Sequence, residues 1–293
     1  MGYGVLVTVF SFISARARDL GGFSVRRTLP STQRRLVGPF IFWDHFGPVQ
    51  LGPGHGMDVR PHPHINLATI TYLFEGEIVH RDSLGSDQAI QPGDVNWMTA
   101  GSGIVHSERT AAALRKAGPA MHGLQTWVAL PTELEETEPG FQHVSGKSLP
   151  ELGQPGTRLR VIAGTAFGET SPVKVLSPMF YVEARLDAGA ELAFPDGHAE
   201  RAAYVVEGAI ECDGRQVEPA TMAVAEAGAH ATIRALRESR VMLLGGAPVG
   251  PRHIWWNFVS SSEERIEQAK RKWKEGGFPK VPGDDVEFAP LPE

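Results

Sequence analysis

The stretch "RPHPHINLATITYLFEGEIVHRD", residues 60–82, places His62 and His64 one residue apart, directly before an apolar run. The residues of that run are largely β-branched and aromatic, which favours a β-strand. Alternate residues of a strand point to the same face, so the two imidazoles would lie side by side. A helix would instead set them roughly 200° apart. The stretch therefore predicts half of a metal site on one strand.

A second pair of candidate ligands follows in "PGDVNWMTAGSGIVHSE", residues 92–108, where His106 and Glu108 are again one residue apart. One His-x-His is a weak signal, because most histidines are simply hydrogen-bonded core or surface residues. Two such pairs give three imidazoles and one carboxylate, a donor set that suits iron, manganese, nickel, cobalt, copper or zinc rather than calcium or magnesium. With a divalent ion the site carries about one positive charge and favours an anionic ligand.

The rest of the chain indicates an all-β protein. It has 293 residues, of which 42% are hydrophobic, with 33 glycines and 22 prolines. These proportions allow a sizeable core and many turns. Short apolar segments such as "GPFIFW", "LRVIAG" and "RVMLLGG" recur between turn signals. Many short strands with this punctuation are typical of a sandwich or barrel.

Two parts of the sequence resemble each other. "TYLFEGEI" (71–78) matches "AYVVEGAI" (203–210), and "QAIQPGD" with "MTAG" (88–101) is echoed by "RQVEPAT" with "AEAG" (215–228). We therefore predict two jelly-roll-like barrels in tandem. Their expected bounds are 1–135 and 158–293, joined by a linker at 136–157 that is rich in Pro, Gly and acidic residues.

A helix is predicted near the end of the chain, in "SSSEERIEQAKRKWKEGG". Ser260 stands three residues before Glu263, the spacing of a capping box. Ile266, Ala269 and Trp273 follow on one helical face, and two glycines and a proline then end the segment. This helix is expected to pack its apolar stripe on a barrel.

Charge and cysteine content exclude some classes of function. The 28 Lys and Arg against 34 Asp and Glu give a net charge of −6, which argues against a general nucleic-acid binder. Cys212 is the one cysteine, so it cannot form an internal disulfide, and a reducing compartment fits. The apolar start at residues 1–20 lacks a basic leader and is too short to span a bilayer. We expect a cytoplasmic protein that does not enter the membrane.

Several phrases carry a resemblance to a known family. "GMDVRPHPH" fits the cupin pattern of a glycine, five residues and then His-x-His, with Gly76 in the closing place. The usual cupin glutamate would fall near Ala68 or Thr69 and is missing, but Glu108 can replace it. Together with "GPFIFWDHFGP", "TYLFEGEIVHRDSLGS" and "GLQTWVALP", this arrangement resembles the pirin family of bicupins. The likeness runs from about residue 19 to 130 and continues more loosely to residue 259.

The resemblance implies an Fe(II) centre bound by the residues that match His62, His64, His106 and Glu108. It also implies a C-terminal barrel that has lost its metal. In that barrel the His-x-His has become His198-x-Glu200, and Thr232 stands where the counterpart of Glu108 would be.

Two activities follow from the resemblance, and the sequence leaves both open. One is an iron-dependent dioxygenase that takes O2 and a flavonol such as quercetin, with Glu108 as the base if it can leave the metal. The other is a non-enzymatic regulator that senses the metal's oxidation state and binds a transcription factor or a metabolic enzyme. Substrate turnover favours the first, and metal-dependent capture of a partner without turnover favours the second. A purely structural bicupin is a third reading, but two facing ligand pairs are costly to bury by accident.

The remaining candidates have weaker patterns. His45 and His55 are candidates for the mouth of the site, and His122 for a contact with its cavity. His80 precedes the "RDSLGS" turn, which predicts an exposed hairpin position. Asp44 is a candidate for orienting a ligand imidazole, as outer carboxylates do around metals.

Overall fold

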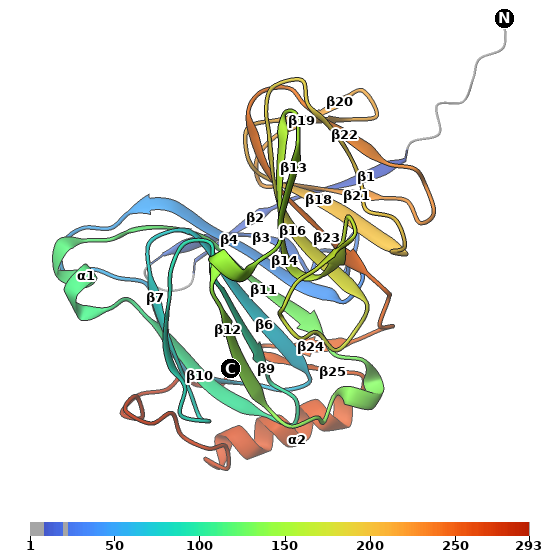
Figure 1. The fold of residues 1–293 in the computed structure, drawn as a ribbon. Helices are drawn as coiled ribbons and strands as arrows, with labels where there is room; N and C mark the ends of the chain where they lie inside the picture. The colour runs from blue at the N-terminus through green and yellow to red at the C-terminus, as the bar shows by residue number, and fades with distance from the viewer. Residues whose placement is uncertain (1–8, 20–22, 293) are drawn as a thin grey trace, which may run out of the picture. The chain divides into compact units, whose positions relative to one another are not determined.

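The chain forms two compact, strand-rich units, seen in the computed structural model of Figure 1. The structure describes residues 9–19 and 23–292. The first barrel unit comprises Ala17–Arg27, Phe40–Ser148 and Val249–Glu293, and the second comprises Met1–Arg16, Thr28–Pro39 and Leu149–Pro248. The expectation about a leader or membrane segment falls partly on residues 1–8, which lie outside the described residues. The prediction of two β-barrels with a C-terminal helix is confirmed.

The first barrel unit is built from two antiparallel sheets. The larger has the order β12 (Gly140–Val144), β9 (Val95–Thr99), β6 (Leu67–Glu75), β11 (Ala120–Ala129), β4 (Phe40–Gln50), β3 (Ser24–Leu29) and β2 (Arg16–Asp19). The smaller has the order β5 (Asp58–His64), β10 (Ile104–Arg109), β7 (Ile78–Asp82) and β8 (Asp87–Ile90). Short helical turns lie at α1 (Ala112–Ala117), η1 (Thr132–Leu134) and η2 (Gly146–Ser148). β6 and β9 are mostly apolar and almost continuously buried, as strands in the centre of a packed sheet are.

The second barrel unit repeats this plan with a core made of apolar side chains. Its larger sheet has the order β1 (Phe10–Ser14), β21 (Thr221–Ala225), β18 (Glu200–Glu207), β23 (Ser239–Gly246), β16 (Met179–Leu186), β14 (Thr157–Ala166) and β13 (Glu151–Gln154), with β15 (Glu169–Thr170) paired to β14. Its smaller sheet has the order β17 (Glu191–Ala193), β22 (Thr232–Ala235), β19 (Ile210–Cys212) and β20 (Arg215–Val217). Phe180, Val205 and Leu243 are fully buried between them.

The internal repeat corresponds to the same turn in both units. Gly76 joins β6 to β7 and Gly208 joins β18 to β19, at φ angles of +91° and +82°. A Cβ at Gly76 would lie 2.4 Å from the carbonyl oxygen of Ala120, and one at Gly208 would lie 2.3 Å from that of Glu238. Only glycine accepts both the backbone conformation and the close approach. The matching "EG" dipeptides are therefore required by the turn.

The chain crosses between the units differently from the predicted boundaries. The expected linker at 136–157 contains strands of both units: β12 extends a sheet of the first unit, and β13 extends one of the second. The segment from Val249 onward, expected in the second barrel, belongs to the first unit. It forms a two-stranded hairpin, β24 (His253–Trp255) with β25 (Phe258–Ser260), followed by α2 (Glu263–Lys274).

Helix α2 is present, and its cap lies two residues after the predicted one. Ser262 is the N-cap, and its hydroxyl accepts from the backbone N–H of Arg265. Ile266 and Ala269 are buried as predicted and pack in a cluster with Phe258 and Phe278. Figure 1 shows α2 beside the β24–β25 hairpin. Ser260 turns its hydroxyl to Glu135 instead, a contact that the sequence pattern does not reveal.

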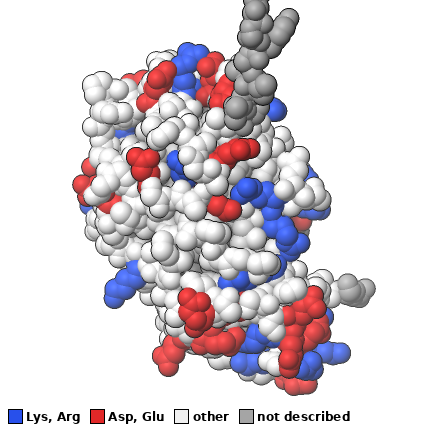
Figure 2. Space-filling view, turned by 90° about the vertical axis from the view of Figure 1, so that its right-hand side faces the viewer, with Lys and Arg blue, Asp and Glu red and all other residues white. Residues whose placement is uncertain are grey.

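Among the described residues, no helix is both long and apolar enough to cross a membrane. Acidic and basic side chains are interspersed on the face drawn in Figure 2, including its lower end, where α2 lies. Two ion pairs involve side chains of α2: Lys270 pairs with Glu267, and Arg265 pairs with Glu136.

Candidate metal centre

Three histidines from two neighbouring strands meet inside the first barrel. His62 and His64 alternate along β5, and His106 lies on β10 directly opposite His62. All three are buried. One ligand nitrogen from each lies within 4.8 Å of the others. No other cluster of at least three such ligands occurs in the part of the chain that the structure describes. The pairing of β5 with β10 thus brings together residues more than 40 positions apart.

The outer nitrogen of each ring is held by a neighbour. Nδ1 of His62 lies 2.8 Å from the carbonyl oxygen of Arg60, and Nδ1 of His64 lies 2.9 Å from that of Asn257. A carbonyl only accepts, so both Nδ1 atoms carry the proton and both Nε2 atoms keep a free lone pair. In His106 it is Nε2 that is buried and without a hydrogen-bond partner among the described residues. A metal ion would satisfy these nitrogens, so the residues present fit one.

Burial keeps these rings in the form that binds a metal. It lowers the pKa of His62 to about 4, and it lowers the pKa values of His64 and His106 well below their ordinary value. The carbonyl of Arg60 opposes the shift in His62, and the neighbouring imidazoles add to it in the other two. All three are therefore neutral at pH 7, and neutral imidazole is the metal ligand.

Glu108 lies near this group without being part of it. It is buried, and its Oε1 accepts from the hydroxyl of Thr71 at 3.1 Å. The group of three ligand atoms does not include a Glu108 oxygen. The register of β5 and β10 shifts between His106 and Glu108. Because β10 pairs with β7 in regular register, the extra residue lies on β5. Burial raises the pKa of the Glu108 carboxyl.

His80 belongs to this site, and the prediction of an exposed position for it is wrong. It is buried on β7, and its Nδ1 lies 3.4 Å from Nδ1 of His106. Its Nε2 lies 3.0 Å from Oδ2 of Asp82. The tautomers that suit this chain have Nε2–H of His80 donating to Asp82 and Nδ1–H of His106 donating to His80, which leaves Nε2 of His106 for the metal. The His-x-Asp spacing within one strand was the available signal.

A cavity of about 410 Å³ opens beside the three histidines. His62, His64 and Glu108 form part of its lining. Phe42 and Trp127 stack at 3.9 Å between ring centroids and form an aromatic wall. The volume lies in the range of small-molecule sites, which are mostly apolar with a few polar groups.

The other candidates lie apart from the ligands. Asp44 lines the cavity but is paired with Arg27 at 2.7 Å rather than with a ligand imidazole. His45 and His122 lie outside the lining and bond each other at 2.8 Å between Nε2 atoms. His55 is exposed.

The corresponding residues of the second barrel are engaged otherwise. Nε2 of His198 lies 2.9 Å from the carbonyl oxygen of Thr165. Oε2 of Glu200 accepts from the backbone N–H of Gly38 at 2.6 Å, and Arg34 lies 3.5 Å from Oε1. His230 is exposed.

Two family models match this chain. Residues 22–128 match the family model "Pirin", and residues 181–279 match the "Pirin C-terminal cupin domain". A "Pirin-like protein" of Caulobacter vibrioides is 55% identical over 95% of this chain and 98% of its own. A Pseudomonas aeruginosa protein named "Putative quercetin 2,3-dioxygenase" is 40% identical over 90% of this chain and 83% of its own.

Solved structures give the same result. A crystal structure of quercetin 2,3-dioxygenase from Acinetobacter baumannii superposes with a TM-score of 0.90 at 33% identity, over 97% of this chain and 95% of the other. A second structure under the same name and from the same organism has a TM-score of 0.85 at 28% identity, over 92% and 98%. With both domain models matched and a relative 55% identical along nearly its whole length, this chain belongs to the pirin family of bicupins.

Proposed function

We propose that this protein is a mononuclear iron dioxygenase that cleaves flavonols such as quercetin, acting in the cytoplasm. One observation carries the proposal. Three buried, neutral imidazoles with free Nε2 atoms form one cluster, and two of them, His62 and His64, line an aromatic-walled cavity of about 410 Å³. The names of the Pseudomonas and Acinetobacter relatives support the choice of substrate.

His62, His64, His106 and Glu108 would hold the metal. Fe(II) is our choice, and the nitrogen-rich set also accepts Mn, Ni, Co, Cu or Zn. When bound, the ion supplies Lewis acidity, which lowers the cost of forming the flavonol anion and its reaction with O2.

When it is not bound to the metal, Glu108 would act as the base toward the 3-hydroxyl group of the flavonol. It is the carboxylate among the cavity residues that lies in the strand of His106, and burial raises its pKa. A carboxylate with a raised pKa takes a proton more readily. Thr71 has one hydroxyl proton and two acceptors in reach, Oε1 of Glu108 at 3.1 Å and Oε1 of Gln125 at 2.8 Å. Its hydroxyl can therefore turn to Gln125 when Glu108 becomes protonated.

The aromatic wall would orient the substrate. The flat rings of a flavonol can lie against Trp127, which also contacts His64 edge-on with 5.0 Å between ring centroids. Offset and edge contacts between rings are each worth about 0.5–1.5 kcal/mol beyond area burial. This contact would hold the reacting carbon atoms near the ligand histidines.

The test is oxygen uptake by anaerobically iron-loaded protein when quercetin is added, beside a His64→Ala variant. We expect O2 consumption equal to flavonol loss in the wild type and none in the variant. If the wild type binds one iron per chain but takes up no oxygen, cleavage of quercetin is excluded and another substrate stays open. The regulator hypothesis would then be examined by capture of partners that distinguish ferrous from ferric protein.

A further inference from the structure

The β24–β25 hairpin brings a distant part of the chain to the metal centre. Its turn consists of Trp256 and Asn257, and both line the cavity. The carbonyl of Asn257 accepts from Nδ1 of His64 at 2.9 Å. The turn therefore sets which nitrogen of His64 is free, although 193 residues separate the two partners.

The conformation of this turn needs support from its surroundings. Trp256 has a φ angle of +53°, in the left-handed region that a bulky residue seldom adopts. Such a conformation is strained and persists only where neighbouring residues determine it. The hairpin has only two strands of three residues each, and an isolated hairpin is marginally stable in water at best. Near the turn, Phe258 forms an isolated bridge with Ile65, next to His64.

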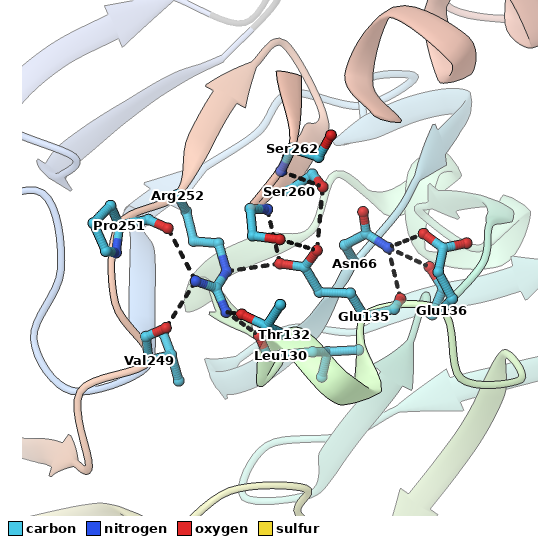
Figure 3. Close-up of polar contacts among 12 residues, drawn as sticks. Asn66, Leu130, Thr132, Glu135, Glu136, Val249, Pro251, Arg252, Ser260 and Ser262 are labelled. Carbon is cyan, nitrogen blue, oxygen red and sulfur yellow. Dashed lines mark hydrogen bonds and ion pairs between the residues drawn. The ribbon is translucent and has the colours of Figure 1, made fainter. Parts of the chain in front are cut away.

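The other end of the hairpin is held by one buried carboxylate, shown in Figure 3. Oε1 of Glu135 lies 2.8 Å from Nε of Arg252 and accepts from the backbone N–H of Ser261 at 2.8 Å. Its Oε2 accepts from the hydroxyl groups of Ser261 at 2.9 Å and Ser260 at 3.2 Å. Arg252 directly precedes β24, and Ser260 ends β25. Glu135 thus joins both ends of the hairpin at its base.

Arg252 anchors this base to the barrel. Its Nη2 donates to the carbonyl of Leu130 at 2.8 Å and to the hydroxyl of Thr132 at 3.2 Å. Leu130 directly follows β11, the strand that carries Trp127 of the cavity wall. Glu135 and Arg252 are each 5% exposed, so removing one partner leaves the other charge buried and unpaired.

We propose that Glu135 and Arg252 are positioning residues for the metal centre. They fix the base of the β24–β25 hairpin, so that its turn holds the carbonyl of Asn257 against His64 and closes one wall of the cavity. This inference rests on the metal centre of the proposed function and is independent of the reaction catalysed there.

The experiment uses Co(II) alone as the probe and the full chain. Its visible absorption reports the geometry around the ion, and a chelator measures the rate of release. Glu135→Gln is expected to change the Co(II) spectrum and to speed release by about tenfold, the lower end for a residue that orients a ligand. Glu133→Gln is the matched control, because Glu133 is exposed on the same loop, and it should behave as wild type.

A second variant covers the case in which Glu135→Gln does not fold. Ser261→Ala removes one hydrogen bond to Glu135 and leaves the ion pair with Arg252 in place. We expect faster release than in wild type, by a smaller factor than for Glu135→Gln. The proposal would be overturned if the folded variants kept the wild-type Co(II) spectrum and release rate and showed only a lower melting temperature. Glu135 and Arg252 would then have a purely structural role. Because no readout uses catalysis, a lack of flavonol cleavage would leave this test intact.

Discussion

The two barrels share a plan and differ in what their ligand-strand positions do. In the first, three buried imidazoles point free nitrogens at one another, and Nε2 of His106 has no partner among the described residues. In the second, His198 and Glu200 bond ordinary backbone groups, and the core cluster is made of apolar side chains. Each unit has a glycine at the equivalent turn, Gly76 in the first and Gly208 in the second.

This difference shows which polar residues the fold itself requires. Burying a polar group without a partner costs roughly 1–3 kcal/mol on the scale of protein mutations. The second barrel shows that the strand framework forms without unpaired imidazoles at these positions, because His198 and Glu200 are both hydrogen-bonded there. The unsatisfied histidines of the first barrel therefore have a role other than folding, and a bound metal would offset their burial.

The largest effect is expected from removing a ligand in one barrel and its counterpart in the other. His106→Ala should weaken Co(II) binding by on the order of 100-fold or more, since even residues that only support a ligand cost about 10–100-fold. His198→Ala should leave one metal per chain with unchanged affinity. Chelator competition and metal content measure both. Loss of metal in His198→Ala, or wild-type affinity in His106→Ala, would contradict the assignment of the metal centre to the first barrel.

A smaller effect is expected behind the ligands. His80→Leu replaces the group that accepts from His106 with an apolar side chain, so it should weaken Co(II) binding by about 10–100-fold. Phe141→Leu is the matched control, because Phe141 stacks on His80 at 4.3 Å and does not contact His106 through a hydrogen bond. Equal affinities in the two variants would show that ring packing alone, and not the hydrogen bond, supports the centre.

Much of the fold could be predicted from local patterns. The two "EG" turns, the strands around them and the apolar stripe of α2 are set by residues close in sequence, and they appear as expected. The position of the last 45 residues could not be predicted. It is held in part by the ion pair of Glu135 with Arg252, more than 100 residues away, and in part by packing against Ile65 and Val105. None of these residues has a sequence pattern that indicates its partner.

The candidate site could also be predicted only as far as local patterns reach. The one-residue spacings in "HPH" and "HSE" place side chains on one strand face, so the three histidines could be found from the sequence. His80 has a His-x-Asp spacing, but only the pairing of β7 with β10 brings it to the ligands. The carbonyl of Asn257 could not be found, because a distant hairpin brings it to His64. A backbone carbonyl has no sequence signature at all.

The first barrel should also be the acid-sensitive one. Burial, with the charge of Arg26 and the neighbouring His122, lowers the pKa of His45 to about 2 from 6.5. Between these values the unfolded chain binds a proton that the folded chain does not. The free energy of unfolding therefore falls as the pH drops below 6.5, by up to about 1.4 kcal/mol per pH unit from this group.

His45→Gln should reduce that pH dependence, whatever it does to stability at pH 7.5. All six tryptophans, which are Trp43, Trp97, Trp127, Trp255, Trp256 and Trp273, lie in the first barrel unit. Their fluorescence during urea unfolding between pH 5 and 7.5 thus follows that unit. An unchanged slope in the variant would mean that His45 is protonated in the folded protein.

The smallest effect is expected at Cys212, in the second barrel. Burial, together with the charges of Asp213 and Glu211, raises the pKa of its thiol to about 12, and the residue is 1% exposed. At pH 8 the thiolate fraction is on the order of 10⁻⁴, so iodoacetamide should leave the folded protein unmodified. Mass spectrometry should show full alkylation after denaturation. Metal loading should not change the result in the folded protein, because Cys212 packs in the apolar core of the other unit. Rapid alkylation of the folded protein would instead show that the second barrel opens in solution. The second barrel would then not be the closed apolar unit that the comparison with the first barrel requires.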